Sequence, residues 1–197
     1  MKHLKLIIIF IFAISANGQN YKALKELYIN RTIPHGQAII YGNFVQRLGF
    51  SSGGFPQDIR LINLETKEIL TFTVKPTLKS AKENTFAYYI NPGKYAILNY
   101  WYTQSKWYGG TFFTEPVYKN IEVDENLEAK IKSGELNVSD LIQFTFVIKE
   151  DSLNYLGTWH FDKKLVSFTD DKTQLDKKIK SRFKKLDFAI AQSVIPN

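Results

Sequence analysis

The chain has 197 residues, of which 44% are hydrophobic and 15% are aromatic. This composition is sufficient to bury a core, which excludes the disordered class of protein and indicates one globular domain. The formal net charge of +7 is mildly basic, and the absence of cysteine excludes disulfides, thiolate zinc sites and cysteine nucleophiles.

Residues 1–18 have the pattern of a secretory signal peptide. Lys2 and Lys5 flank the start of an apolar run at 6–13, and small residues follow at 16–18. The apolar run is short for a bilayer span, although a retained N-terminal anchor is the alternative. We therefore expect export to the periplasm or the exterior, a mature chain with no transmembrane segment, and no nucleic-acid partner.

The segment 19–35 is expected to contain a short helix. Its apolar residues recur at helical spacing before Pro34 stops the pattern. These residues are Tyr21, Leu24, Leu27 and Tyr28.

A β-rich domain is expected over residues 36–169. It begins with a strand at 36–45 and a glycine-rich loop at 48–57. No lysine follows these glycines and no helix opens after them, so the loop does not match a phosphate-binding motif. Residues 58–64 and 68–74 then form a predicted hairpin.

The central feature is a second predicted hairpin, over residues 85–103. Two runs rich in β-forming residues meet at Asn91-Pro92-Gly93-Lys94. Proline pre-sets φ at the first central turn position, and glycine supplies a positive φ at the next. After the turn, apolar or aromatic groups occupy both faces. This predicts either a central strand covered on both sides or a strand with one aromatic face left exposed.

The elements expected next are a polar loop at 104–110, strands at 111–114 and 117–123, a glycine-capped helix at 124–134, a buried segment at 141–148, and a hairpin formed by 153–161 and 165–169. The total of roughly seven to nine short strands at regular spacing is typical of a sandwich or barrel. The predicted fold class is therefore mainly β.

Residues 170–197 are predicted to add an amphipathic helix and a tail to the same domain. Asp170 or Asp171 can cap the helix, which is expected to run to Leu186 and to pack its apolar face on a sheet. Its apolar residues are Leu175, Ile179, Phe183 and Leu186, and its basic residues are Lys177, Lys178, Lys180, Arg182, Lys184 and Lys185. The basic face is either simply solvated or binds an anionic surface such as a membrane or lipopolysaccharide.

The sequence contains no pattern typical of a metal, cofactor or catalytic site. His35 and His160 lack a second ligand at metal-binding spacing, so we expect no metal and no cofactor. His160 and Asp162 could meet on one face of a strand as an acid–base pair. The alternative interpretation is a histidine at a strand end beside an acid in a turn, and we assign no catalytic residue.

A cluster of aromatic residues provides the best candidate for a binding site. Its members are Tyr100, Trp101, Tyr102, Trp107 and Tyr108. Exposed rings on a sheet commonly stack on sugars or anchor a protein partner, whereas buried rings would simply belong to the core. The position of Trp107 and Tyr108 in a polar loop favours their exposure.

The Asn-Pro-Gly-Lys-Tyr turn within residues 86–98 resembles the late hairpin of transthyretin-like or carboxypeptidase-regulatory-like β-sandwich domains. A later strand with Asn154-Tyr155-Leu156-Gly157, followed by a terminal amphipathic helix, resembles small secreted bacterial proteins of unknown function with that type of sandwich. The resemblance implies an antiparallel β-sandwich that acts as a non-catalytic accessory, adhesive or binding module.

The expected function is therefore that of an exported β-sandwich protein that binds a glycan or protein of the cell envelope or exterior. An envelope-polymer hydrolase that uses His160 with unidentified carboxylates is one alternative. A structural envelope component without a small ligand is another.

Overall fold

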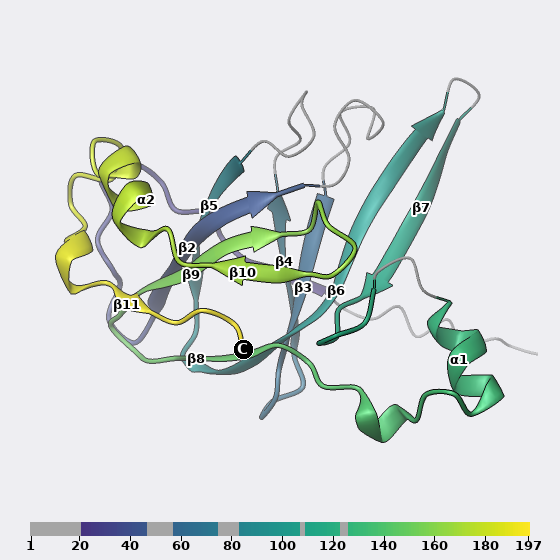
Figure 1. Ribbon diagram of the computed structural model, residues 1–197. Helices are drawn as coiled ribbons and strands as arrows, with labels where there is room; N and C mark the ends of the chain where they lie inside the picture. The colour runs from purple at the N-terminus through teal and green to yellow at the C-terminus, as the bar shows by residue number, and fades with distance from the viewer. Residues whose placement is uncertain (1–20, 47–56, 75–82, 107–108, 123–125) are drawn as a thin grey trace, which may run out of the picture.

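The computed structural model describes residues 21–46, 57–74, 83–106, 109–122 and 126–197 (Figure 1). The predicted signal peptide and most of the glycine-rich loop lie outside these residues, as do Trp107 and Tyr108. The described part is mainly β and forms two sheets with few helices. The mainly β fold class is thus confirmed.

The larger sheet, sheet A, consists of β1 (Tyr21–Ala23), β4 (Ile69–Val74), β3 (Gln57–Asn63), β6 (Gly93–Lys106) and β7 (Gly109–Pro116) in that order, with β8 (Thr145–Ile148) paired to β6. Sheet B consists of β10 (Ser167–Thr169), β9 (Leu153–His160), β2 (Ala38–Val45) and β5 (Glu83–Ile90), with β11 (Gln192–Ser193) paired to β9. The predicted hairpins β3–β4 and β9–β10 are both present.

The sheets are mixed, which corrects the expectation of purely antiparallel strands. The central strand β2 pairs antiparallel with β5 but parallel with β9, and β1 pairs parallel with β4. Every residue of β2 is buried, because sheet B is covered on both faces at this position. A near-continuous apolar strand of this kind is typical of parallel pairing inside a protein.

The predicted central hairpin is wrong. β5 pairs with β2, whereas β6 pairs with β3, β7 and β8, so the turn at residues 91–92 carries the chain from sheet B to sheet A. Gly93 has φ +151°, and a Cβ there would lie 2.8 Å from Asn63 Nδ2. The Tyr95 hydroxyl donates to the Asn91 carbonyl over 2.8 Å. Turn chemistry predicted the reversal of the chain but not the partners of its arms.

The N-terminal segment is extended, and the predicted helix is absent from residues 21–28. β1 pairs with β4 of sheet A, and Leu24 N donates to Thr71 O over 2.8 Å. Leu27 N then donates to Ala87 O in sheet B over 2.9 Å. The segment therefore satisfies backbone groups at the edges of both sheets, a demand that outweighs its weak helical spacing.

The polar loop predicted at 104–110 is instead largely strand. β6 continues to Lys106 and β7 starts at Gly109, and the resulting hairpin projects from the body of the molecule (Figure 1). The strand expected at 117–123 is missing from residues 117–122, where Glu122 forms only an isolated bridge with Leu165.

The helix predicted at 124–134 is confirmed as α1 (Leu127–Ser133). Asn126 accepts a hydrogen bond from Ala129 N at its start, and Gly134 ends it with φ +77°. Short 3₁₀ turns occur at Val138–Asp140 and Phe188–Ile190.

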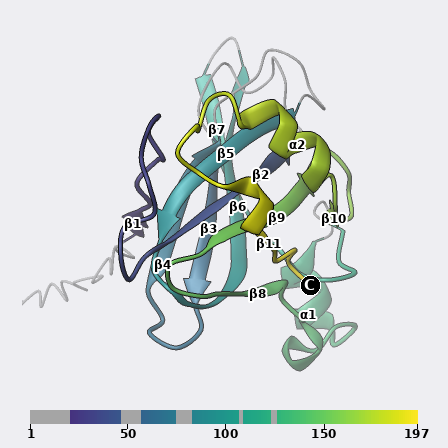
Figure 2. The same cartoon turned by 90° about the vertical axis from the view of Figure 1, so that its left-hand side faces the viewer.

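The C-terminal helix α2 (Lys172–Ile179) is shorter than predicted, because the chain leaves the α-helix after Ile179 and continues in turns. All four predicted apolar residues are nevertheless buried, including Phe183 and Leu186 beyond the helix end. They pack with Ile39 and Tyr155 of sheet B. Figure 2 shows α2 lying over β2 and β9.

Residues from both sheets form the main core. Trp159 of sheet B is fully buried, and its ring lies 5.8 Å from that of Phe72 in sheet A. A second core cluster lies between sheet B and the C-terminal region. Sheet B therefore buries both faces, whereas no described helix contributes to a core on the far face of sheet A. We call this far face the open face.

Candidate functional site

The open face of sheet A carries one row of residues from each of its strands. In β3, burial alternates along the strand, with Asp58 and Arg60 on the partly exposed side. Asp58 is directly opposite Trp101 of β6, and Trp101 is opposite Thr114 of β7. Because directly opposed residues point to the same face of a sheet, Trp101 belongs to the open face.

Trp101 forms a stacked pair with Phe112 of β7. Their ring centroids lie 5.3 Å apart at an interplanar angle of 17°. Phe112 is 66% exposed, and Trp101 is partly buried. The pair forms a flat aromatic surface at the base of the projecting hairpin.

A second aromatic group lies on the same face. The Arg60 guanidinium is 3.9 Å from the centre of the Tyr21 ring, and its Nη1 donates to the Tyr21 hydroxyl over 3.1 Å. Arg60 is directly opposite Asn99, two residues before Trp101. The open face thus combines aromatic rings with hydrogen-bonding side chains.

Tyr100 and Tyr102 are core residues, which corrects their assignment to a binding surface. Tyr100 is 0% exposed and donates its hydroxyl proton to Gln57, which in turn donates to Gln46. Tyr102 is also buried and stacks on Phe113. Since side chains alternate along a strand, Tyr100 and Tyr102 face inward while Trp101 between them faces outward.

The predicted contact of His160 with Asp162 is only loose, at 3.7 Å from Nδ1 to Oδ1. His160 Nε2 lies 2.9 Å from Thr169 Oγ1, which gives the order hydroxyl, imidazole, carboxylate of a hydrolase triad. The Thr169 hydroxyl, however, donates to Asp171 Oδ2 over 2.8 Å. It therefore accepts from His160, whereas a nucleophile must donate to its base.

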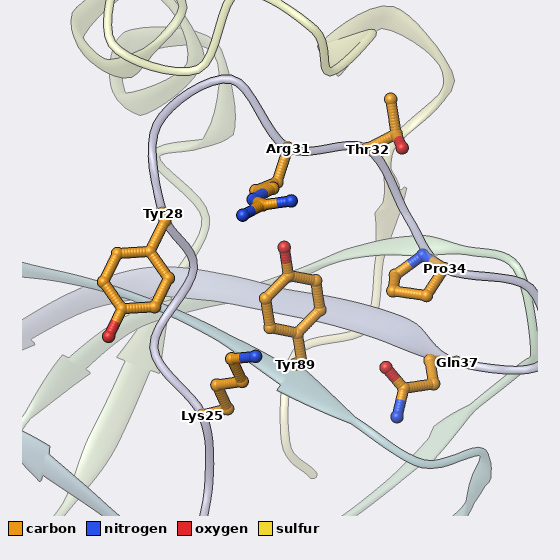
Figure 3. Close-up of a pocket in the computed structure, with 7 residues that line it drawn as sticks. All are labelled: Lys25, Tyr28, Arg31, Thr32, Pro34, Gln37 and Tyr89. Atoms are coloured by element: carbon orange, nitrogen blue, oxygen red, sulfur yellow. The ribbon is translucent and has the colours of Figure 1, made fainter.

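A hollow that sequence reasoning missed lies beside the N-terminal segment (Figure 3). It has a volume of about 360 Å³ and is lined by Lys25, Tyr28, Arg31, Thr32, Pro34, Gln37 and Tyr89. The available signal was the mixture of cationic, aromatic and proline residues in 25–34. That signal was obscured because part of this stretch was assigned to a helix.

Two other features were searched for among the described residues. None of their helices has the length and apolar character required to cross a bilayer. They also contain no group of three or more histidine, aspartate or glutamate side chains arranged to hold a metal ion.

Comparisons with known proteins do not assign a family. No family model matches the chain, and no curated protein matches it. Among solved structures, a leucine-rich repeat protein from Bacteroides thetaiotaomicron is similar with a TM-score of 0.35 and 13% sequence identity. The match covers 77% of this chain and 16% of that protein's chain.

Proposed function

We propose that the protein is an exported, non-catalytic binding protein that recognises a glycan of the cell envelope or exterior through the open face of sheet A. The observation that carries the proposal is the stacked Trp101–Phe112 pair on the sheet face that lacks a helical cover. Flat pairs of rings present the kind of surface on which the apolar face of a sugar stacks.

The scaffold in this proposal is a β-sandwich of transthyretin-like type with α2 packed outside it. The shared core of the two sheets supports this arrangement, since Trp159 and Phe72 meet there from opposite sheets. The expected signal peptide at 1–18 supports export.

The polar groups around the aromatic pair fit a hydroxylated ligand. Arg60 supplies N–H donors, and the Asp58 carboxylate, which accepts from the Thr73 hydroxyl over 2.7 Å, supplies acceptor capacity. A sugar that covers about 60 Å² of ring surface gains roughly 1.5 kcal/mol, or about tenfold in affinity. One stacked sugar is thus a weak ligand, and several along the face are required for tight binding.

The polarity of the Thr169 hydrogen bonds does not favour the hydrolase alternative. A protein partner and a structural role without a small ligand become outcomes of the same experiment.

The experiment measures retention of the protein on immobilised envelope polysaccharides. We expect Trp101→Ala and Phe112→Ala each to weaken retention about tenfold. Ile190→Ala is the matched control, because Ile190 is 70% exposed but lies in the C-terminal region beyond α2. Equal retention of all three variants would remove the site. Loss of a crosslinked protein partner instead of a glycan would transfer the site to protein binding.

A further inference from the structure

The hollow of Figure 3 is formed where the N-terminal segment passes the ends of two strands of sheet B. Tyr89 comes from β5, and Gln37 directly precedes β2. The remaining lining residues all belong to the segment 25–34. The hollow contains neither Trp101 nor Phe112, so an inference about it is independent of the proposed glycan face.

The walls of the hollow are held at both ends. On one side, Tyr89 N donates to Lys25 O and Leu27 N donates to Ala87 O, both over 2.9 Å. On the other side, Gly36 N donates to Asp151 Oδ1 over 2.7 Å, and His35 Nδ1 lies 3.1 Å from the second carboxylate oxygen. Gly36 has φ +74°, a conformation that glycine adopts without strain. A wall fixed at both ends loses little freedom when it binds a ligand.

The charge lining the hollow is purely positive. Lys25 and Arg31 extend toward Tyr89 from two sides, and no lining residue is acidic (Figure 3). Within the described ranges, neither cation forms an ion pair with a carboxylate. Burial raises the pKa of the Tyr89 hydroxyl, and the charge of Arg31 acts in the opposite direction. The field of Arg31 therefore reaches the centre of the hollow.

A second hollow of about 250 Å³ continues from the first along the same segment. The two share Lys25, Gln37 and Tyr89, and the second also has no acidic lining residue. Lys22 lines this extension, but it is paired with Glu68 at 3.0 Å. The unpaired positive charge is therefore concentrated in the first hollow.

The side chains select the chemistry of a ligand. An ammonium and a guanidinium are donors only, and the Tyr89 hydroxyl and Gln37 amide can donate beside them. Donors without a competing carboxylate favour an oxyanion, which guanidinium groups bind through paired N–H bonds. Tyr28 and the Pro34 ring add apolar walls. A volume of about 360 Å³ is at the small end of ligand sites, which suits one or two sugar rings.

We propose that this hollow is a binding site for a small sugar that carries an oxyanion, either a carboxylate or a phosphate, with the anion between Lys25 and Arg31 and the ring against Tyr89.

The test is a calorimetric titration of the whole protein with glucuronate, glucose 6-phosphate and neutral glucose. We expect at least one of the two anionic sugars to bind and glucose to bind at least about tenfold more weakly, because it lacks a charge-assisted hydrogen bond. Binding of glucuronate alone identifies a carboxylate ligand, and binding of the phosphate alone identifies a phosphate ligand. No binding of either anion, or equal binding of glucose, overturns the proposal.

Variants locate the site. Arg31→Gln and Lys25→Gln each remove one charge and should weaken the anion about tenfold. Lys132→Gln is the matched control, because it removes an exposed lysine from α1, which Figure 1 shows far from the N-terminal segment. Equal weakening by all three variants would show nonspecific charge attraction and overturn the proposal. Failure here leaves the glycan face untouched, since Trp101→Ala is not expected to change this titration.

Discussion

Removing a single hydroxyl should loosen the attachment of α2 to sheet B. Tyr41 of β2 is buried, and its hydroxyl donates to Asp176 Oδ1 over 2.7 Å. The other carboxylate oxygen accepts from Lys172 Nζ over 2.6 Å. A hydrogen bond to a charged group contributes about 1.5–3 kcal/mol. Tyr41→Phe keeps the ring, so it should lower the free energy of unfolding by about 2 kcal/mol and Tm by roughly 4–8 °C.

Urea and thermal unfolding of a small variant set measure this effect. Asp176→Ala should cost more than Tyr41→Phe, because it leaves the Tyr41 hydroxyl buried without its acceptor. The double variant should cost little more than Asp176→Ala alone, since both changes remove the same bond. Tyr28→Phe is the control, because Tyr28 is 60% exposed. A Tyr41→Phe variant within about 0.5 kcal/mol of the wild type would refute the reasoning.

Two further outcomes are expected. Gly42→Ala would place a Cβ 2.5 Å from the Gly157 carbonyl oxygen, so calorimetry should show a loss of about 3 kcal/mol. Gly110→Ala, which meets only the Thr103 side-chain methyl at 3.1 Å, should be much milder, and equal losses would contradict this packing. Burial raises the pKa of Tyr88 to about 12. This contribution to stability is complete below pH of about 10, the unfolded value, and is lost as pH rises toward 12. A flat profile of unfolding free energy between about pH 9 and 11.5 would contradict it.

Local chemistry made several elements predictable. The helix α1 follows from a short apolar spacing and a terminal glycine, and Gly134 does adopt the positive φ that a glycine cap requires. The burial of Leu175 and Ile179 follows from their spacing on one helix face. In each case the determining residues lie within one or two turns of one another.

Pairing between distant segments was not predictable by the same means. The turn at Asn91-Pro92 has strong reversal chemistry, yet its two arms join different sheets. The residues that decide this, such as those of β2 and β3, lie far away in the chain. The N-terminal segment similarly follows open backbone groups of Thr71 and Ala87 that no local pattern announces.

The candidate site was predictable only in part. The alternation of Tyr100, Trp101 and Tyr102 implies that neighbouring rings lie on opposite faces, but it does not say which face is open. The answer depends on α2, which covers sheet B and leaves the far face of sheet A without a helix. Phe112 became a partner of Trp101 only through the β6–β7 register. Trp107 and Tyr108 remain a prediction.

The most direct test of the glycan face is fluorine NMR of the protein labelled with 5-fluorotryptophan during titration with envelope polysaccharide. Trp101→Phe assigns the Trp101 resonance, and Trp159, which is 0% exposed in the core, serves as an internal reference. The account predicts that the Trp101 resonance shifts with ligand while that of Trp159 does not. A Trp101 resonance that stays in place while the polysaccharide binds would contradict it.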